Sequence, residues 1–192
     1  MTNRTKIAST ISKITEPMLI IALLIVLGAF HAGIGGTPFF LFLLYILAVS
    51  AGIWIARLRI MSSMHTNWDI SERPKRVRML LSLLATSVLV FLSFAVWRSP
   101  RLLWFCAELM VWLVGFFLIT LKTKISGHIG ILTLFIGYLT RWYGLPFALL
   151  FATLPLVGWS RLVLKRHTRI EVIGGAGYSL LVILLFVVLS VW

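Results

Sequence analysis

The sequence is poor in charged residues, and above all in acidic ones. Charged residues make up 12% of its 192 positions, and only 5 residues are Asp or Glu. A soluble domain of this length needs far more charge to cover its surface. Hydrophobic residues account for 60% of the chain, and the mean hydropathy is +1.05. The composition therefore excludes an ordinary soluble protein and indicates a chain surrounded mainly by lipid.

The apolar residues come in long blocks. About 20 apolar residues are enough for a helix to cross the hydrocarbon core of a bilayer. The blocks are residues 18–35, 38–56, 79–97, 102–121, 128–139, 145–159 and 170–192. The fifth and sixth blocks are short, and they form either two tilted spans or one interrupted hairpin. The sequence therefore predicts an all-α transmembrane helix bundle with six to seven spans.

Few features divide the chain. Its single cysteine, Cys106, lies inside an apolar block and is expected to act as a small buried hydrophobic residue without an internal disulfide. Because no repeat, low-complexity tract or long linker is present, residues 1–192 are expected to form a single integral-membrane domain. The first block follows a basic stretch, as in a signal peptide. It lacks a good cleavage site, and we expect a retained helix.

The basic residues are concentrated on one side of the predicted membrane. If each block crosses once, 15 of the 18 Lys and Arg residues share a face, and the other face has Arg98, Arg101 and Arg141. The positive-inside rule places the basic face and the N-terminus in the cytoplasm, and the C-terminus outside. The net charge of +13 is carried by short loops between apolar blocks. We therefore expect contact with membrane lipids and not with nucleic acid.

Two of the four histidines lie at the start of apolar blocks on the basic face. His128 ends the stretch KISGH at residues 124–128, and His167 lies in the stretch SRLVLKRHTRIE at residues 160–171. These residue types suit a phosphate site. An arginine such as Arg161 offers a planar fork to two phosphate oxygens. Backbone N–H groups at a helix start, here residues 126–128, bind anions.

His167 and Glu171 stand four residues apart. On a helix they would share a face, so the carboxylate could hold one imidazole nitrogen while the other faces phosphorus. This is the arrangement of a nucleophile and its orienting group in covalent catalysis.

These stretches resemble motifs of the type 2 phosphatidic acid phosphatase (PAP2) superfamily. Residues 160–171 resemble its third motif, Ser-Arg-x5-His-x3-Asp, and residues 126–128 resemble its second, Pro-Ser-Gly-His. The first motif, Lys-x6-Arg-Pro, is matched only by Arg73 and Pro74, because Thr66 stands at the lysine position. The matched region covers residues 73–177 and implies a PAP2-like core.

The chain is more similar to small prokaryotic members of this superfamily. They carry Arg-x-x-Arg before a hydrophobic hairpin, then Lys-Ile-Ser-x-His, and then His-Thr-Pro-x-Glu or Gln. Arg73 and Arg76 match the first element, and Lys124 would replace the missing lysine. Ile125 and Glu171 replace the proline and aspartate of the better-known motifs.

The resemblance implies an integral-membrane lipid-phosphate phosphatase of a prokaryotic cytoplasmic membrane, without metal or cofactor. His167 would form a phosphohistidine, Glu171 would fix its tautomer, and His128 would protonate the leaving oxygen. The residues implied in binding the phosphoryl group are Arg73, Arg76, Lys124, Ser126, Gly127 and Arg161. The substrate would be an isoprenyl diphosphate, phosphatidate or phosphatidylglycerol phosphate.

Two alternatives stay open. One is a phosphotransferase that passes the phosphoryl group from the same histidine to a second lipid. The other is a non-catalytic lipid-binding or transport protein. Lys75 and Arg76 are equally consistent with ordinary loop charge, and His31 and His65 are expected to be structural. Glu108, inside a span, is expected to make a hydrogen bond between helices.

Overall fold

The computed structural model of the chain describes residues 2–63 and 73–189. Every regular element in these ranges is helical, which confirms the all-α class. The α-helices are α1 (Asn3–Ile14), α2 (Pro17–His31), α3 (Gly36–Ser63), α4 (Arg73–Ser93), α5 (Pro100–Lys122), α6 (Gly127–Tyr143), α7 (Leu154–Val163) and α8 (Arg169–Val188). Two 3-10 helices, η1 (Phe94–Trp97) and η2 (Leu145–Thr153), precede α5 and α7.

Five helical stretches among the described residues are long and apolar enough to cross a membrane. They are Asn3–His31, Gly36–Ala56, Pro100–Lys122, Leu145–Val163 and Arg169–Val188. The apolar part of α4, Leu80–Ser93, is shorter, and α6 has 17 residues. The structure thus supports a polytopic membrane protein with five candidate spans, whereas the sequence predicted six to seven.

The chain divides into two compact units, which are described separately. Unit 2 covers residues 22–122 and contains most of α2 together with α3, α4, η1 and α5. Here α4 packs against α5 and α3. Aromatic rings of α3 and η1 pack together, with ring centroids 5.4 Å apart for Phe42 and Phe94 and 5.1 Å apart for Phe42 and Trp97. Glu108, on α5, is fully buried.

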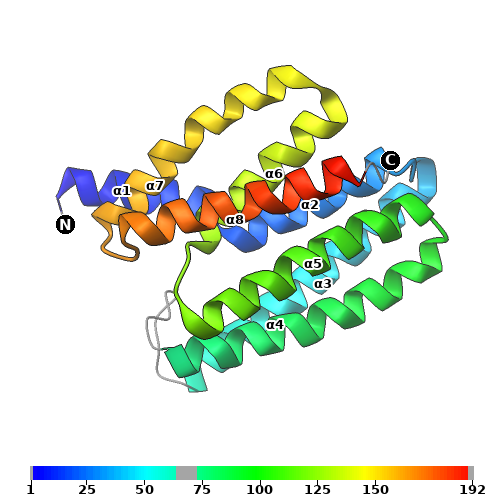
Figure 1. Cartoon of the computed structure of the whole chain (residues 1–192). Helices are drawn as coiled ribbons and strands as arrows, with labels where there is room; N and C mark the ends of the chain where they lie inside the picture. Colours follow the sequence, from blue (N-terminus) through cyan, green and yellow to red (C-terminus); the bar gives the residue numbers. More distant parts are fainter. Residues whose placement is uncertain (1, 64–72, 190–192) are drawn as a thin grey trace. The chain divides into compact units, whose positions relative to one another are not determined.

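Unit 1 covers residues 2–21 and 123–189 and is built around α6. Residues 129–134 and 136–139 of this helix are buried. Within the unit α6 packs against α8, α7 and η2, and α1 packs against α7 (Figure 1). Ile129, Leu132 and Ile136 of α6 form a buried apolar cluster with Val157 of α7.

The fifth and sixth apolar blocks form a helical hairpin in unit 1. Gly144 has a φ of +100°, a conformation that favours glycine, and it separates α6 from η2. Pro146 follows in the first turn of η2, where its missing N–H has no helical partner to lose. Both helical arms extend beyond the predicted blocks. The first reaches from 127 to 143 and the second, η2 with α7, from 145 to 163.

The start of α6 is tied closely to α8. Ser126 is the N-cap of α6, and its carbonyl accepts from the Gly130 N–H at 2.9 Å. Its own N–H donates to the Glu171 carbonyl of α8 at 2.9 Å. One turn further along α8, a Cβ added to Gly175 would lie 2.5 Å from the Ser126 carbonyl oxygen. Glycine is therefore required at 175 for this approach.

Gly175→Ala should lower the stability of the protein. The added methyl group overlaps the Ser126 carbonyl, and overpacking of this kind costs about 1–3 kcal/mol. Gly177→Ala is the matched control on the same helix, because among the described residues the added Cβ would meet no atom within 4 Å apart from its chain neighbours and its own helix backbone. It should be neutral or stabilising by up to about 1 kcal/mol, since alanine favours helix. Thermal unfolding in detergent measures both, and equal melting temperatures would contradict the close approach.

Candidate functional site

Helix α7 ends in a left-handed turn that sets the spacing between Arg161 and His167. Lys165 has a φ of +54°. Its N–H donates to the Leu162 carbonyl, and the Arg166 N–H donates to the Arg161 carbonyl, each at 3.0 Å. This pair of bonds is the Schellman motif, which commonly ends helices. The chain thereby passes from α7 to α8 in only the five residues 164–168.

His167 and Glu171 meet through the capping box of α8. Thr168 is the N-cap, and its Oγ1 accepts from the Glu171 N–H at 3.3 Å. In return, Glu171 Oε2 accepts from the Thr168 N–H at 3.1 Å. The same Oε2 lies 2.9 Å from His167 Nδ1. The two side chains are adjacent as the sequence predicts, but the expected reason is wrong. His167 precedes the helix, so the two residues do not share a helix face.

This contact fixes the protonation pattern of the His167 ring. An ionised carboxylate only accepts hydrogen bonds, so Nδ1 carries the hydrogen that Glu171 receives. In a neutral ring the lone pair is then on Nε2. The ring is largely buried, with 6% of the side chain exposed, which limits its freedom to turn. When its ring is neutral, His167 thus presents an oriented Nε2 lone pair, as a nucleophile requires.

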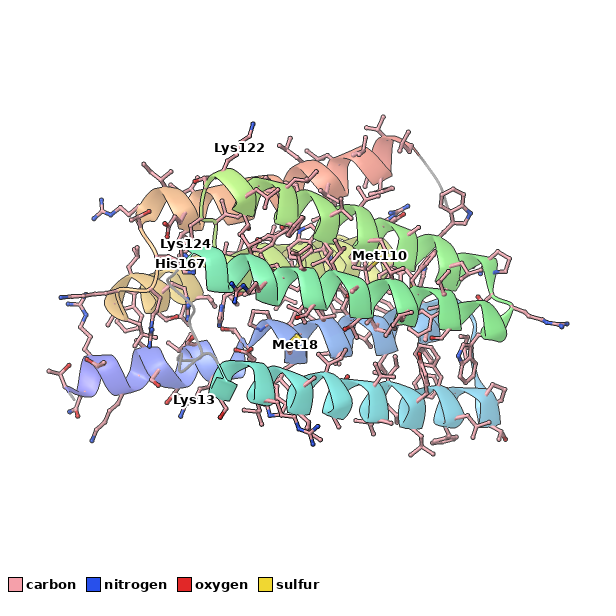
Figure 2. All side chains as sticks on the ribbon, turned by 90° about the horizontal axis from the view of Figure 1, so that it is seen from below. Lys13, Met18, Met110, Lys122, Lys124 and His167 are labelled. Carbon is pink, nitrogen blue, oxygen red and sulfur yellow. The ribbon has the colours of Figure 1, made fainter. Side chains whose placement is uncertain are left out.

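The segment before α6 is attached to the same turn. Lys124 Nζ donates to the Arg166 carbonyl at 2.7 Å, next to His167, and Figure 2 shows Lys124 and His167 close together. The Ser126 N–H, one of the predicted anion donors, is used by Glu171. Ser126 Oγ is fully buried and has no hydrogen-bond partner among the described residues. The donors suited to an anion here are this hydroxyl and the N–H of Gly127, the first residue of α6.

Arg161 and His128 are connected through the N-terminal helix. Arg161 is 4% exposed, and its Nη1 donates to Ser12 Oγ of α1 at 2.6 Å. The same hydroxyl lies 3.5 Å from His128 Nε2. Helix α1 is also held to α7 by Arg4, whose guanidinium lies 5.8 Å from the centre of the Trp159 ring. The second and third motif segments therefore meet against α1.

Glu16 completes this group, with Oε2 at 3.6 Å from His128 Nε2. Sequence reasoning missed both Ser12 and Glu16, because contacts between residues more than a hundred positions apart leave no local pattern. A signal for Glu16 was nevertheless present. Acidic residues number only 5 in the chain, and this one directly precedes a proline and an apolar block.

Not every predicted site residue can be placed with this group. Arg73 is the first residue of α4 and belongs to unit 2, as does Arg76. The side chains of both, and of Lys75, lie outside the described residues, as do Asp69 and Glu72. The sequence-based assignment of Arg73 and Arg76 to the phosphate site therefore stays a prediction.

No group of three or more His, Cys, Asp or Glu side chains suited to a metal ion occurs in the described part of the chain. The donors around His128 and His167 are instead Arg, Lys, Ser and backbone N–H groups, which suit an anion. Whether the chemistry needs a metal is tested below.

No protein-family model matches this sequence, and no curated protein and no solved structure is significantly similar to it. The resemblance to the PAP2 superfamily therefore rests on the motif residues alone and stays a prediction.

Replacing Lys165 by glycine should stabilise the turn between α7 and α8. A residue with a Cβ in the left-handed region costs roughly 1–2 kcal/mol, which glycine avoids. The expected gain is about 1 kcal/mol in thermal unfolding. Lys165→Ala is the matched control, because it also removes the charge but keeps the Cβ. A gain of equal size in both variants would show that charge, and not the φ of +54°, limits stability here.

Proposed function

We propose that this protein is an integral-membrane lipid-phosphate phosphatase that acts through a phosphohistidine at His167. The observation that carries the proposal is the contact of His167 Nδ1 with Glu171 Oε2 at 2.9 Å. This contact lies at the turn between α7, which contains Arg161, and α8, and Lys124 Nζ donates to the Arg166 carbonyl in the same turn. An oriented imidazole beside cationic side chains is what nucleophilic attack on a phosphate requires. Ser126 Oγ, buried without a partner among the described residues, supplies a further donor.

The proposed reaction has two steps. In the first, Nε2 of His167 forms a bond to phosphorus, the bond from phosphorus to the lipid oxygen breaks, and His128 gives a proton to that oxygen. In the second, water attacks phosphorus, the bond to Nε2 breaks, and His128 recovers a proton from the water. The imidazolium of His167 is stabilised by Glu171. Arg161, Lys124, Ser126 and the Gly127 N–H are assigned to the phosphoryl oxygens, and stabilising this charge is usually the largest catalytic effect.

A lipid substrate is supported by the apolar surface beside the catalytic pair. Ile170 and Ile173, in the first turns of α8, are 83% and 69% exposed. Ile7 and Ile14 of α1 are also largely exposed. In a membrane protein such side chains face acyl chains, so the site would lie at the boundary between lipid and headgroups. A phosphate carried on an acyl or isoprenyl chain can reach such a site without leaving the membrane.

The proposal includes the finer topology predicted from the sequence. The bundle would have six to seven spans and a PAP2-like core in a prokaryotic cytoplasmic membrane, with the site on the cytoplasmic face. The support is the uneven distribution of the 18 basic residues. The bases of unit 1 include Lys124, Arg161, Lys165 and Arg166, all at or near the site.

His167→Ala should reduce release of inorganic phosphate from lipid phosphates by at least about 10³-fold, because the nucleophile is lost. Activity of the wild type should persist in excess EDTA. Acid-labile phosphate should be trapped on the wild-type protein but not on this variant. His31→Ala, in unit 2, is the matched control and should retain activity. Phosphate appearing on a second lipid instead of in water would identify a phosphotransferase, and a strict metal requirement would contradict the mechanism.

Cysteines placed at the two ends of α5 can show on which side of the membrane the site lies. Thr123 and Arg101 are both exposed and lie at opposite ends of this 23-residue candidate span. In a Cys106→Ala background, a membrane-impermeant thiol reagent added to intact cells should label Arg101→Cys and leave Thr123→Cys unlabelled. Permeabilised cells should show labelling of both. The reverse pattern in intact cells would place the basic face outside.

A further inference from the structure

We propose that Glu16 is the positioning residue for the general acid: its carboxylate keeps His128 protonated for donation to the leaving oxygen. This inference rests on the proposed phosphatase function and adds a role for the N-terminal segment. The observation behind it is the contact of Glu16 Oε2 with His128 Nε2 at 3.6 Å, with both side chains only 18% and 15% exposed.

The charge balance of unit 1 shows why such a residue is needed. Residues 1–21 and 123–191 contain nine Lys and Arg but only two acidic residues, Glu16 and Glu171. Each of the two carboxylates contacts one of the two histidines of the unit. Surrounding cations disfavour a protonated imidazole, and a nearby carboxylate favours it. Removing the Glu16 carboxylate would therefore weaken the preference of His128 for its protonated form.

The two histidine–carboxylate contacts differ in a way that suits different roles. Glu171 lies at hydrogen-bond distance, 2.9 Å, and accepts the Nδ1 hydrogen of His167. Glu16 lies at 3.6 Å, too far for a direct hydrogen bond, so it stabilises the imidazolium by charge without capturing its proton. His128 Nε2 also lies 3.5 Å from Ser12 Oγ, the hydroxyl that Arg161 contacts. His128 Nε2 and Arg161 thus share a neighbour in Ser12 Oγ, and in the proposed reaction the Nε2 proton passes to the leaving oxygen.

The position of Glu16 is set by the break between α1 and α2. Thr15 ends α1, with its N–H donating to the Ile11 carbonyl at 3.0 Å, and Pro17 begins α2. Proline suits the first position of a helix and keeps the preceding residue out of the helical conformation. The Glu16 carbonyl accepts from Leu19 and Ile20, at 3.0 and 3.1 Å. Glu16 is therefore fixed by its backbone between two helices, and its carboxylate does not depend on a flexible loop.

A comparison of two leaving groups tests this role. A long-chain alkyl phosphate needs a proton on its leaving oxygen, whereas dinitrophenolate leaves without one. Glu16→Gln should lower kcat for the alkyl phosphate by about 10–100-fold, a large part of the usual effect of a general acid. For dinitrophenyl phosphate, kcat should change by less than about threefold. KM should stay within about threefold for both, because Glu16 is assigned no contact with the phosphate.

Two further variants separate charge from structure. Glu16→Asp keeps the carboxylate and should retain more alkyl phosphate activity than Glu16→Gln. Lys13→Gln, at an exposed neighbouring position, also changes the charge by one unit and should leave the ratio of the two substrates unchanged. Equal losses on both substrates in Glu16→Gln, or no loss on the alkyl phosphate, would overturn the proposal. His167→Ala is measured in parallel. If that variant hydrolyses both substrates, the proposed function itself fails, whatever Glu16 does.

Discussion

Three hydrogen bonds to Glu171 hold the candidate site together. Its Oε2 accepts from His167 Nδ1 at 2.9 Å and from the Thr168 N–H at 3.1 Å, and its carbonyl accepts from the Ser126 N–H at 2.9 Å. The start of α8, the tautomer of His167 and the entry into α6 therefore depend on one residue. A glutamine at 171 could cap the helix but could not balance an imidazolium, so the structural and chemical roles of this side chain are separable in principle.

Positive charge exceeds negative charge in unit 1. Nine basic residues are offset by two carboxylates, each of which is already placed against a histidine. Arg161 is almost fully buried, and its Nη1 donates to Ser12 Oγ. An excess of positive charge attracts anions such as phosphate. This property is consistent with the proposed function.

Part of this architecture could be predicted from the sequence. The helical class and the membrane location follow from long apolar blocks, since lipid allows only closed hydrogen-bonding structures. The short distance between His167 and Glu171 could also be predicted, although the capping box that produces it replaces the expected helix face. The spacing of five residues between Arg161 and His167 also has a local cause, which is the left-handed turn at Lys165.

Other parts could not be predicted, because they depend on tertiary contacts. Ser12 and Glu16 lie more than a hundred residues from the groups they contact, and no periodicity in α1 marks them. The hydrogen bond from the Ser126 N–H to the Glu171 carbonyl could not be predicted either, because it requires the close approach of Ser126 to α8 that Gly175 permits. The number of spans depends on how the short apolar part of α4 and the 17-residue helix α6 meet the bilayer, which length and hydropathy leave open.

The contact between Ser12 and Arg161 joins residues separated by 149 positions, and this has a consequence for synthesis. A chain that has emerged only as far as α5 already carries Ser12 and Glu16, but not His128 or Arg161, which their side chains contact. Closing a loop of this length is slow, and its ordering cost is met only when the last helices dock. During translation the contacts of α1 with α6 and α7 can therefore form only after these later helices have been made. The proposed site can assemble only once α8 has also been made.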